Sequence, residues 1–76
     1  METFGFKKAI KYIAAGQEVN MVSEDFKSHI FRKNNNNSSD NIIHEIVGSN
    51  NRIITLNIDI DNMKSKFGNN KFYIRD

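Results

Sequence analysis

The 76-residue chain contains no cysteine, no proline and no tryptophan, and Leu56 is its only leucine. Without cysteine it can form no disulfide, and thiolate zinc sites, iron–sulfur clusters and cysteine nucleophiles are excluded. A chain of this length builds one domain, residues 1–76, whose core is barely large enough to stabilise it alone. Small domains of this kind gain stability from disulfides, metals or partner subunits. We therefore expect a homo-oligomer.

Long apolar runs and a dominant charge are also missing. No stretch approaches the roughly 20 apolar residues that cross a bilayer, and the first six residues lack the layout of a secretory signal. We expect a soluble, intracellular protein with no membrane partner. The 11 Lys and Arg residues are interspersed with 9 Asp and Glu residues, for a net charge of +2. This mixture is typical of a solvated surface, so a nucleic acid is a less favoured partner.

The first predicted element is an amphipathic helix. Apolar residues recur at three- and four-residue spacing between residues 6 and 14, which places them on one face of a helix. We expect Thr3 to be its N-cap. Gly16 occupies the place of a left-handed residue that ends a helix.

The rest of the chain alternates strand signals with turn residues. Aromatic and β-branched residues predict strands over 26–33, 42–47 and 52–60, after a short extended segment at 17–21. The polar segment 34–41 is predicted to be a flexible loop, and an Asn-rich hairpin turn follows Gly48. In the strand 52–60, alternation predicts one buried face, formed by Ile54, Leu56, Ile58 and Ile60.

A short helix and a last strand complete the prediction. Asp59 or Asp61 caps this helix, Gly68 ends it, and the strand covers residues 72–74. Strands joined by turns form antiparallel sheets. The predicted fold is α+β, with an N-terminal helix packed on a small antiparallel sheet and a second short helix before the last strand.

The sequence offers little for catalysis. His29 and His44 could face each other on neighbouring strands, and Glu45 or Asp40 could join them in a metal site. Because no His-x-x-x-His spacing is present, we expect two partly exposed strand histidines instead.

The remaining candidates for catalytic residues are explained better by structural roles. The pair Asp59 and Asp61 precedes a helix, so capping explains it better than magnesium binding or acid–base catalysis. No serine lies in a Gly-x-Ser-x-Gly turn, and the glycines are too scattered for a nucleotide-binding loop. We predict no catalytic residue, no metal and no cofactor, and we expect that the protein is not an enzyme.

Binding is the favoured class of function. Aromatic and basic residues interleave at 26–33 and 71–75, and such side chains stack on bases and neutralise phosphates. The predicted ligand-binding residues are Phe26, Phe31, Arg32, Lys33 and Arg52. In the interpretation that we favour for these segments, Phe26, Phe72 and Ile74 belong to the core and the charges surround it, because a small domain needs most of its aromatic residues for packing.

Both ends of the chain resemble one protein family. The spacing F-x-x-A-I-x-x-I-x-x-G-x-x-V over residues 6–19 is similar to the opening of small phage proteins that counter the Thoeris defence system. The close of the chain, with Ile60-Asp61 before a short helix and the segment 72–74 at the end, resembles the same family. The chain departs from the family pattern at residues 20–26, where members carry Arg and Trp.

The resemblance implies a homo-oligomeric α+β protein in the cytoplasm of an infected bacterial host. Such proteins bind a cyclic-nucleotide-type immune signal without cleaving it, with pockets at subunit junctions. The function expected on this basis is sequestration of an anionic nucleotide signal. The alternative is a protein-binding inhibitor that occludes a host defence factor or nuclease, through an exposed strand edge or the Asn-rich loop.

Overall fold

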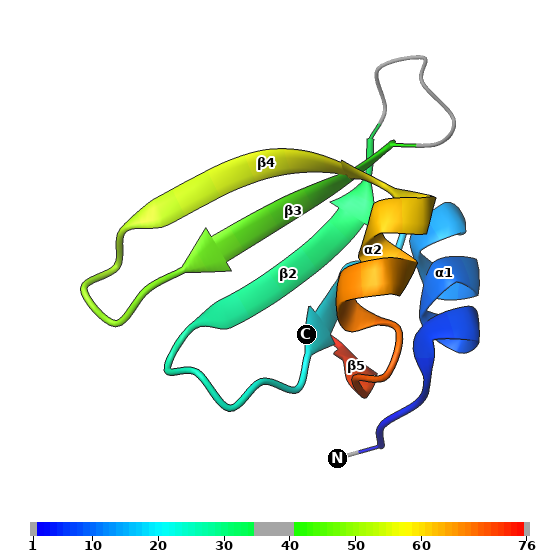
Figure 1. Ribbon diagram of the computed structural model, residues 1–76, viewed down its shortest axis with the longest axis horizontal. Coiled ribbons are helices and arrows are strands. Elements are labelled where there is room, and N and C mark those ends of the chain that lie inside the picture. Colours follow the sequence, from blue (N-terminus) through cyan, green and yellow to red (C-terminus); the bar gives the residue numbers. More distant parts are fainter. Residues whose placement is uncertain (1, 35–40, 76) are drawn as a thin grey trace.

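The computed structural model of the chain describes residues 2–34 and 41–75. Its elements follow the order α1 (Phe6–Ala14), β1 (Val19–Met21), β2 (Ser28–Lys33), β3 (Asn41–Val47), β4 (Ile53–Asp59), α2 (Ile60–Phe67) and β5 (Phe72–Ile74). The strands form an antiparallel sheet in the order β4-β3-β2-β1-β5 (Figure 1). This arrangement confirms the predicted α+β fold. The interior of the predicted loop 34–41 lies outside the described residues.

The prediction is wrong for the N-terminal end of helix α1 and correct for its C-terminal end. Its N-cap is Gly5, with no side-chain cap, so the prediction of Thr3 as N-cap is wrong. The residues before Gly5 are engaged elsewhere, because Phe4 forms two backbone hydrogen bonds with Phe72 of β5. At the other end, Gly16 has a φ of +94°, as predicted for the left-handed residue after a helix.

Strand β2 begins at Ser28, two residues later than predicted. The preceding residues form a turn instead, in which the Asp25 carboxylate accepts hydrogen bonds from the Ser23 hydroxyl and the Lys27 N–H. Phe26 therefore lies in a loop, where its side chain is 94% exposed. The interpretation that placed aromatic residues of these segments in the core is wrong for Phe26 and confirmed for Phe72, which is fully buried.

Helix α2 has the cap that the sequence predicts. The Asp59 carboxylate accepts a hydrogen bond of 2.7 Å from the backbone N–H of Asn62. Gly68 follows the last turn, with its N–H donating to the Lys64 carbonyl at 2.9 Å. A Cβ at Gly68 would lie 2.3 Å from that carbonyl oxygen, so the close approach requires glycine here.

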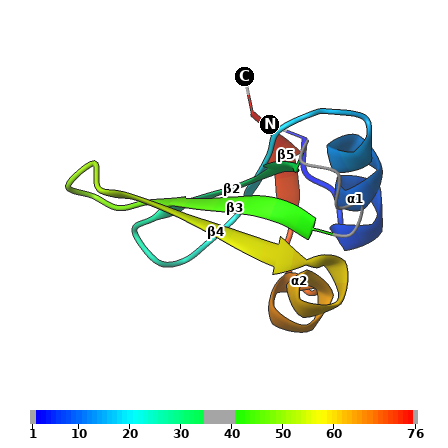
Figure 2. The same ribbon diagram turned by 90° about the horizontal axis from the view of Figure 1, so that it is seen from above.

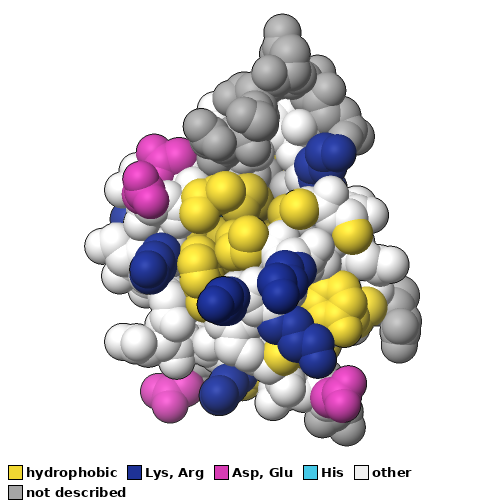
Figure 3. All heavy atoms as spheres, turned by 90° about the vertical axis from the view of Figure 1, so that its right-hand side faces the viewer, with side chains coloured by type: hydrophobic (Ala, Val, Ile, Leu, Met, Phe, Trp, Pro, Cys, Tyr) yellow, Lys and Arg dark blue, Asp and Glu magenta, His cyan; other side chains and the backbone are white. Residues whose placement is uncertain are grey.

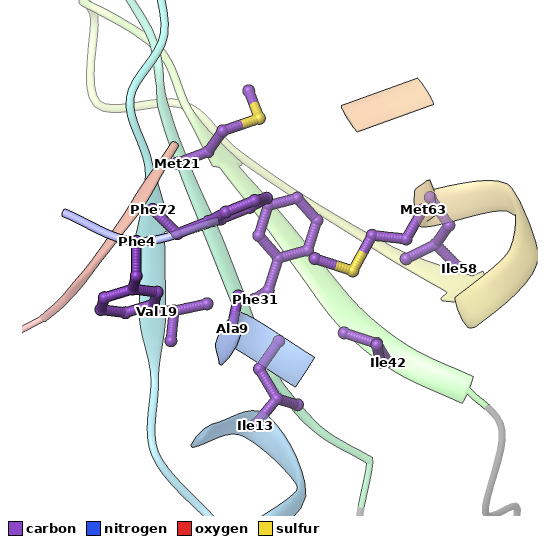
Figure 4. Close-up of a cluster of buried hydrophobic side chains, with 10 residues drawn as sticks. All are labelled: Phe4, Ala9, Ile13, Val19, Met21, Phe31, Ile42, Ile58, Met63 and Phe72. Carbon is purple, nitrogen blue, oxygen red and sulfur yellow. The ribbon is translucent and has the colours of Figure 1, made fainter. Parts of the chain in front are cut away.

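The core lies between the two helices and one face of the sheet (Figure 4). The strand register places Val19, Phe31 and His44 side by side on that face. Each large apolar side chain that is buried in this way stabilises the fold by about 1.5–3 kcal/mol. The buried apolar residues of this core are Phe4, Ala9, Ile13, Val19, Met21, Phe31, Ile42, Ile58, Met63 and Phe72. Ile30 is also buried, on the opposite face of the sheet.

Both helices lie at the same end of the molecule, and the β3–β4 hairpin extends away from them (Figure 2). Strand β4 is therefore covered by a helix only near its C-terminal end, where α2 begins. In the described part of the chain, neither helix is long and apolar enough to cross a membrane.

Candidate functional site

The two edges of the sheet differ in how they are finished. At the β5 edge, the N–H of Phe4 donates to the Phe72 carbonyl at 2.9 Å, and the N–H of Phe72 donates to the Phe4 carbonyl at 2.8 Å. The N-terminal segment thus covers that edge. At the opposite edge, β4 is seven residues long, and no strand within residues 2–34 and 41–75 pairs with its outer side.

The hairpin turn sets which backbone groups of β4 point outward. The N–H of Gly48 donates to the Arg52 carbonyl at 2.9 Å, and Asn51 takes a positive φ of 64° in the predicted hairpin turn. Hydrogen-bonded and non-hydrogen-bonded pairs alternate along an antiparallel ladder. Because Gly48 and Arg52 form a hydrogen-bonded pair, the N–H and C=O groups of Ile53, Thr55 and Asn57 point away from β3.

Three apolar side chains of β4 are exposed. Ile53 is 59% exposed, and Ile54 and Leu56 are each 47% exposed. The predicted buried face of this strand is therefore wrong for Ile54 and Leu56, because the helices cover the sheet only toward Ile58, which is 8% exposed. Long, flat and apolar edge strands are the sheet edges that pair with other chains.

Opposite charges mark the two ends of this edge. Arg52 precedes β4 and is exposed, and Asp59 and Asp61 lie where β4 passes into α2. Between them, residues 53–57 are uncharged and all exposed. The edge is therefore a neutral apolar stretch with a basic start and an acidic end.

A cavity of about 350 Å³ lies at the hairpin end, on the face of β4 that carries Ile54. Lys27 and Arg52 both line it, together with the polar turn residues and Ile46. The exposed ring of Phe26 precedes Lys27 in the chain. The same loop carries Glu24 and Asp25, so acidic groups balance the two cations there.

The structure separates the five predicted ligand-binding residues. Phe26 and Arg52 lie toward the hairpin end, whereas Lys33 is exposed at the far end of β2. Phe31 is fully buried and stacks on the His44 ring at 4.4 Å, so the prediction that it stacks on a base is wrong. Arg32 points to the opposite face of the sheet and forms an ion pair with Glu45, which occupies its charge.

Lys33 borders a different surface, on the helix side of the molecule. It lines a cavity of about 260 Å³ with apolar residues of α1, β3 and α2, among them Ile10, Ile42 and Ile60. Figure 3 shows this side of the molecule, where a hydrophobic patch is flanked by Lys and Arg side chains. The sequence predicted the amphipathic helix α1 but not the apolar hollow beside it.

The two buried histidines form a hydrogen-bonded chain that ends at the exposed carboxylate of Asp25. Nε2 of His29 lies 3.0 Å from Oδ2 of Asp25, and Nδ1 of His29 lies 3.0 Å from Nε2 of His44. The expected meeting of the two rings is confirmed, but the prediction that they are partly exposed is wrong, since His29 is 7% and His44 5% exposed. The face of β2 that holds His29 also holds Phe31, and the core covers both.

The protonation states of this chain follow from its surroundings. Hydrogen bonds from Ser23 and His29 lower the pKa of Asp25 from 3.8 to about 2, so its carboxylate is ionised at neutral pH. Burial, and then the proximity of His29 and Lys66, lower the pKa of His44 from 6.5 to about 4. Ionised Asp25 is therefore the acceptor for Nε2–H of His29, and one hydrogen bond joins Nδ1 of His29 to Nε2 of His44.

A second cavity, of about 400 Å³, lies beside the histidines between β3, β4 and α2. Both histidines line it, together with Leu56, Asn62 and Lys66. In the parts of the chain that the structure describes, no three His, Cys, Asp or Glu side chains gather as a metal site would require. The histidine chain satisfies its own hydrogen bonds, which is the ordinary state of buried polar groups.

Sequence reasoning missed the open β4 edge, although one signal was present. The doublet Ile53-Ile54 places apolar side chains on both faces of a strand, which a strand with one solvated face does not need. Lys27 was also missed as a neighbour of Arg52, because only the pairing of β2 with β3 brings the two loops together. No family model, no curated protein and no solved structure matches this chain.

Proposed function

We propose that this protein acts by binding and that its β4 edge adds to a β-strand of another polypeptide. The observation that carries this proposal is the uncovered edge with exposed Ile53, Ile54 and Leu56, at a sheet whose other edge is covered. Strand addition needs outward backbone groups and side chains that fit alternate pockets of the partner. The added strand belongs either to a second copy of this chain or, in the anti-defence setting that the family resemblance implies, to a protein that this chain occludes.

The expected contributions to the binding free energy are consistent with strand addition at this edge. Each backbone hydrogen bond made across it contributes a net 0.5–1.5 kcal/mol, approximately, and Ile53, Thr55 and Asn57 each offer one donor and one acceptor. Completing the burial of a half-exposed isoleucine or leucine adds about 1 kcal/mol. Affinity then comes from the backbone, and the choice of partner comes from the apolar side chains.

Amide hydrogen exchange tests strand addition. A synthetic peptide of alternating valine and threonine is added to the purified protein, and exchange is followed at Ile53, Thr55 and Asn57. These three amides should become protected, or be protected already if a polypeptide occupies the edge. Thr55→Pro removes one outward N–H without touching the β3 ladder and should weaken peptide binding.

Val22→Lys is the matched control, because Val22 is 42% exposed but lies outside β4. It should bind the peptide as the unmodified protein does. Fast exchange at all three β4 amides, with and without the peptide, would contradict the proposed function.

A second candidate function is sequestration of an anionic nucleotide-type ligand. The cavity at the hairpin end favours it, because Lys27 and Arg52 line one hollow and Phe26 exposes its ring beside it. The two cations would contact phosphate, Phe26 would stack on the base, and Asn50 would offer an amide to the base edge.

Thermal unfolding with cyclic dinucleotides and ADP-ribose isomers tests this candidate. A ligand at 100 times its Kd stabilises the folded state by about 2.7 kcal/mol, which raises Tm measurably. The double variant Lys27→Ala/Arg52→Ala should lose the shift, and Lys7→Ala/Lys64→Ala, with two charges removed from the helices, should keep it. A shift that both double variants retain would place the ligand elsewhere.

A further inference from the structure

We propose that the polypeptide at the β4 edge is a second copy of this chain, paired antiparallel about a twofold axis that passes through Thr55. The inference rests on the proposed function, because it names the partner of the same edge. Three features of β4 support it: its exposed stretch is symmetric about Thr55, its apolar residues match across the axis, and its ends carry opposite charges.

The exposed stretch determines the register. Residues 53–57 are exposed, and Ile58 is buried. An axis at Thr55 pairs Thr55 with Thr55 of the second copy, and Ile53 with Asn57 of the second copy. These are the residues whose N–H and C=O groups point outward, so each finds a hydrogen-bonded partner. The turn residues and the start of α2 stay outside the new ladder.

The apolar side chains meet in this register. Ile54 lies directly opposite Leu56 of the second copy, in the non-hydrogen-bonded positions where side chains approach most closely. Leu56 in turn faces Ile54 of the second copy, so four side chains that are each 47% exposed in one chain cover one another. A partner of arbitrary sequence would not provide this match.

The charges select the antiparallel orientation. With the axis at Thr55, Arg52 lies opposite residue 58 of the second copy, at the end of β4 that leads into the acidic residues Asp59 and Asp61. The twofold axis repeats this contact at the other end. A parallel copy would instead bring Arg52 beside Arg52 and Asp59 beside Asp59, and like charges side by side across a sheet are destabilising.

The pairing would also stabilise a domain whose own core is small. The core of this 8.8 kDa chain lies at its helix end, and the hairpin end has no layer packed on it. Pairing through β4 joins two five-stranded sheets and removes the open edge from both. Partner subunits are a common supplement to cores of this size.

Light scattering and sedimentation on the purified protein test the pairing. The expected mass is twice 8.8 kDa at high concentration, with dissociation on dilution. Leu56→Lys places a charge opposite Ile54 of the second copy and should shift the protein to the monomer, whereas the control Val22→Lys should remain dimeric. Isotope-filtered contacts between differently labelled copies should join Ile54 of one to Leu56 of the other.

The orientation has its own test. Arg52→Glu should weaken the dimer roughly tenfold, and Arg52→Glu/Asp61→Lys should recover much of the loss because the charges are exchanged. A monomer at all concentrations would overturn the inference, and so would a dimer that Leu56→Lys leaves intact. A monomer that still protects its β4 amides with the strand peptide would overturn the inference while the proposed function stands.

Discussion

Individual residues in this protein take roles that depend on which neighbours cover them. Phe26 and Phe31 are both aromatic residues beside a basic one, yet Phe26 is 94% exposed and Phe31 is fully buried. The difference arises because the Asp25 turn keeps Phe26 out of β2, whereas the register of β1, β2 and β3 places Phe31 beneath the helices. A ligand can reach only the first of the two rings.

His44 makes stability depend on pH at the residue scale. In the unfolded chain it takes up a proton near pH 6.5, but in the folded protein its pKa is about 4. The unfolded state therefore binds more protons between these values, and acidification from pH 6.5 to 4 should lower Tm. The Asp25 pKa of about 2 adds a second loss, as pH falls below 3.8.

Calorimetry from pH 8 to 3 and an NMR titration of the His44 ring measure this dependence. In His44→Phe the loss between pH 6.5 and 4 should shrink, although the variant is less stable at pH 7 because His29 loses its hydrogen-bond partner. Lys66→Gln should raise the pKa of His44, since it removes a nearby positive charge. Titration of His44 at its ordinary value of 6.5 would contradict the buried state.

At the scale of elements, β4 and α2 show that a local sequence pattern can predict an element correctly without predicting which part of it is buried. Alternation predicts the strand correctly, and the Asp59 cap predicts the helix after it. The alternation does not reveal which face is covered, because α2 turns back at Ile60 and protects only the nearby end of β4. The exposed part of the strand is where we propose that another chain binds.

Removal of the α2 cap should have a measurable cost. Asp59→Ala deletes the acceptor for the Asn62 N–H and should reduce the free energy of unfolding by about 1 kcal/mol. Asp59→Asn keeps a capping oxygen and should retain most of the stability. Urea unfolding at pH 7 compares the three proteins, and an equal loss in both variants would mean that the charge, and not the cap, is what stabilises the helix.

At the scale of the whole molecule, the helices, the core and the covered β5 edge lie at one end, and the hairpin extends from the other (Figure 1). This division explains how a chain of 76 residues can hold both a packed core and a long exposed apolar strand. The packed end holds the fold together. The hairpin end offers its edge, its two cations and Phe26 for binding.

The candidate site could be predicted only in part. Lys and Arg positions, the aromatic residues and the Asn51 turn are visible in the sequence, and Phe26 and Arg52 were named from it. Their common location with Lys27 depends on strand pairing, which joins residues more than 20 positions apart. The burial of Phe31 and the ion pair of Arg32 depend on the same pairing.

Local sequence signals predict the elements of this protein, their order and most of their ends, because caps, turns and side-chain periodicity act within a few residues of chain. The tertiary structure alone decided which edge is covered, that His29 and His44 are buried together, and that Ile54 and Leu56 stay exposed. These outcomes depend on where two short helices pack on a five-stranded sheet. Two helices cannot cover the whole sheet, and only their placement determines which strand is left open.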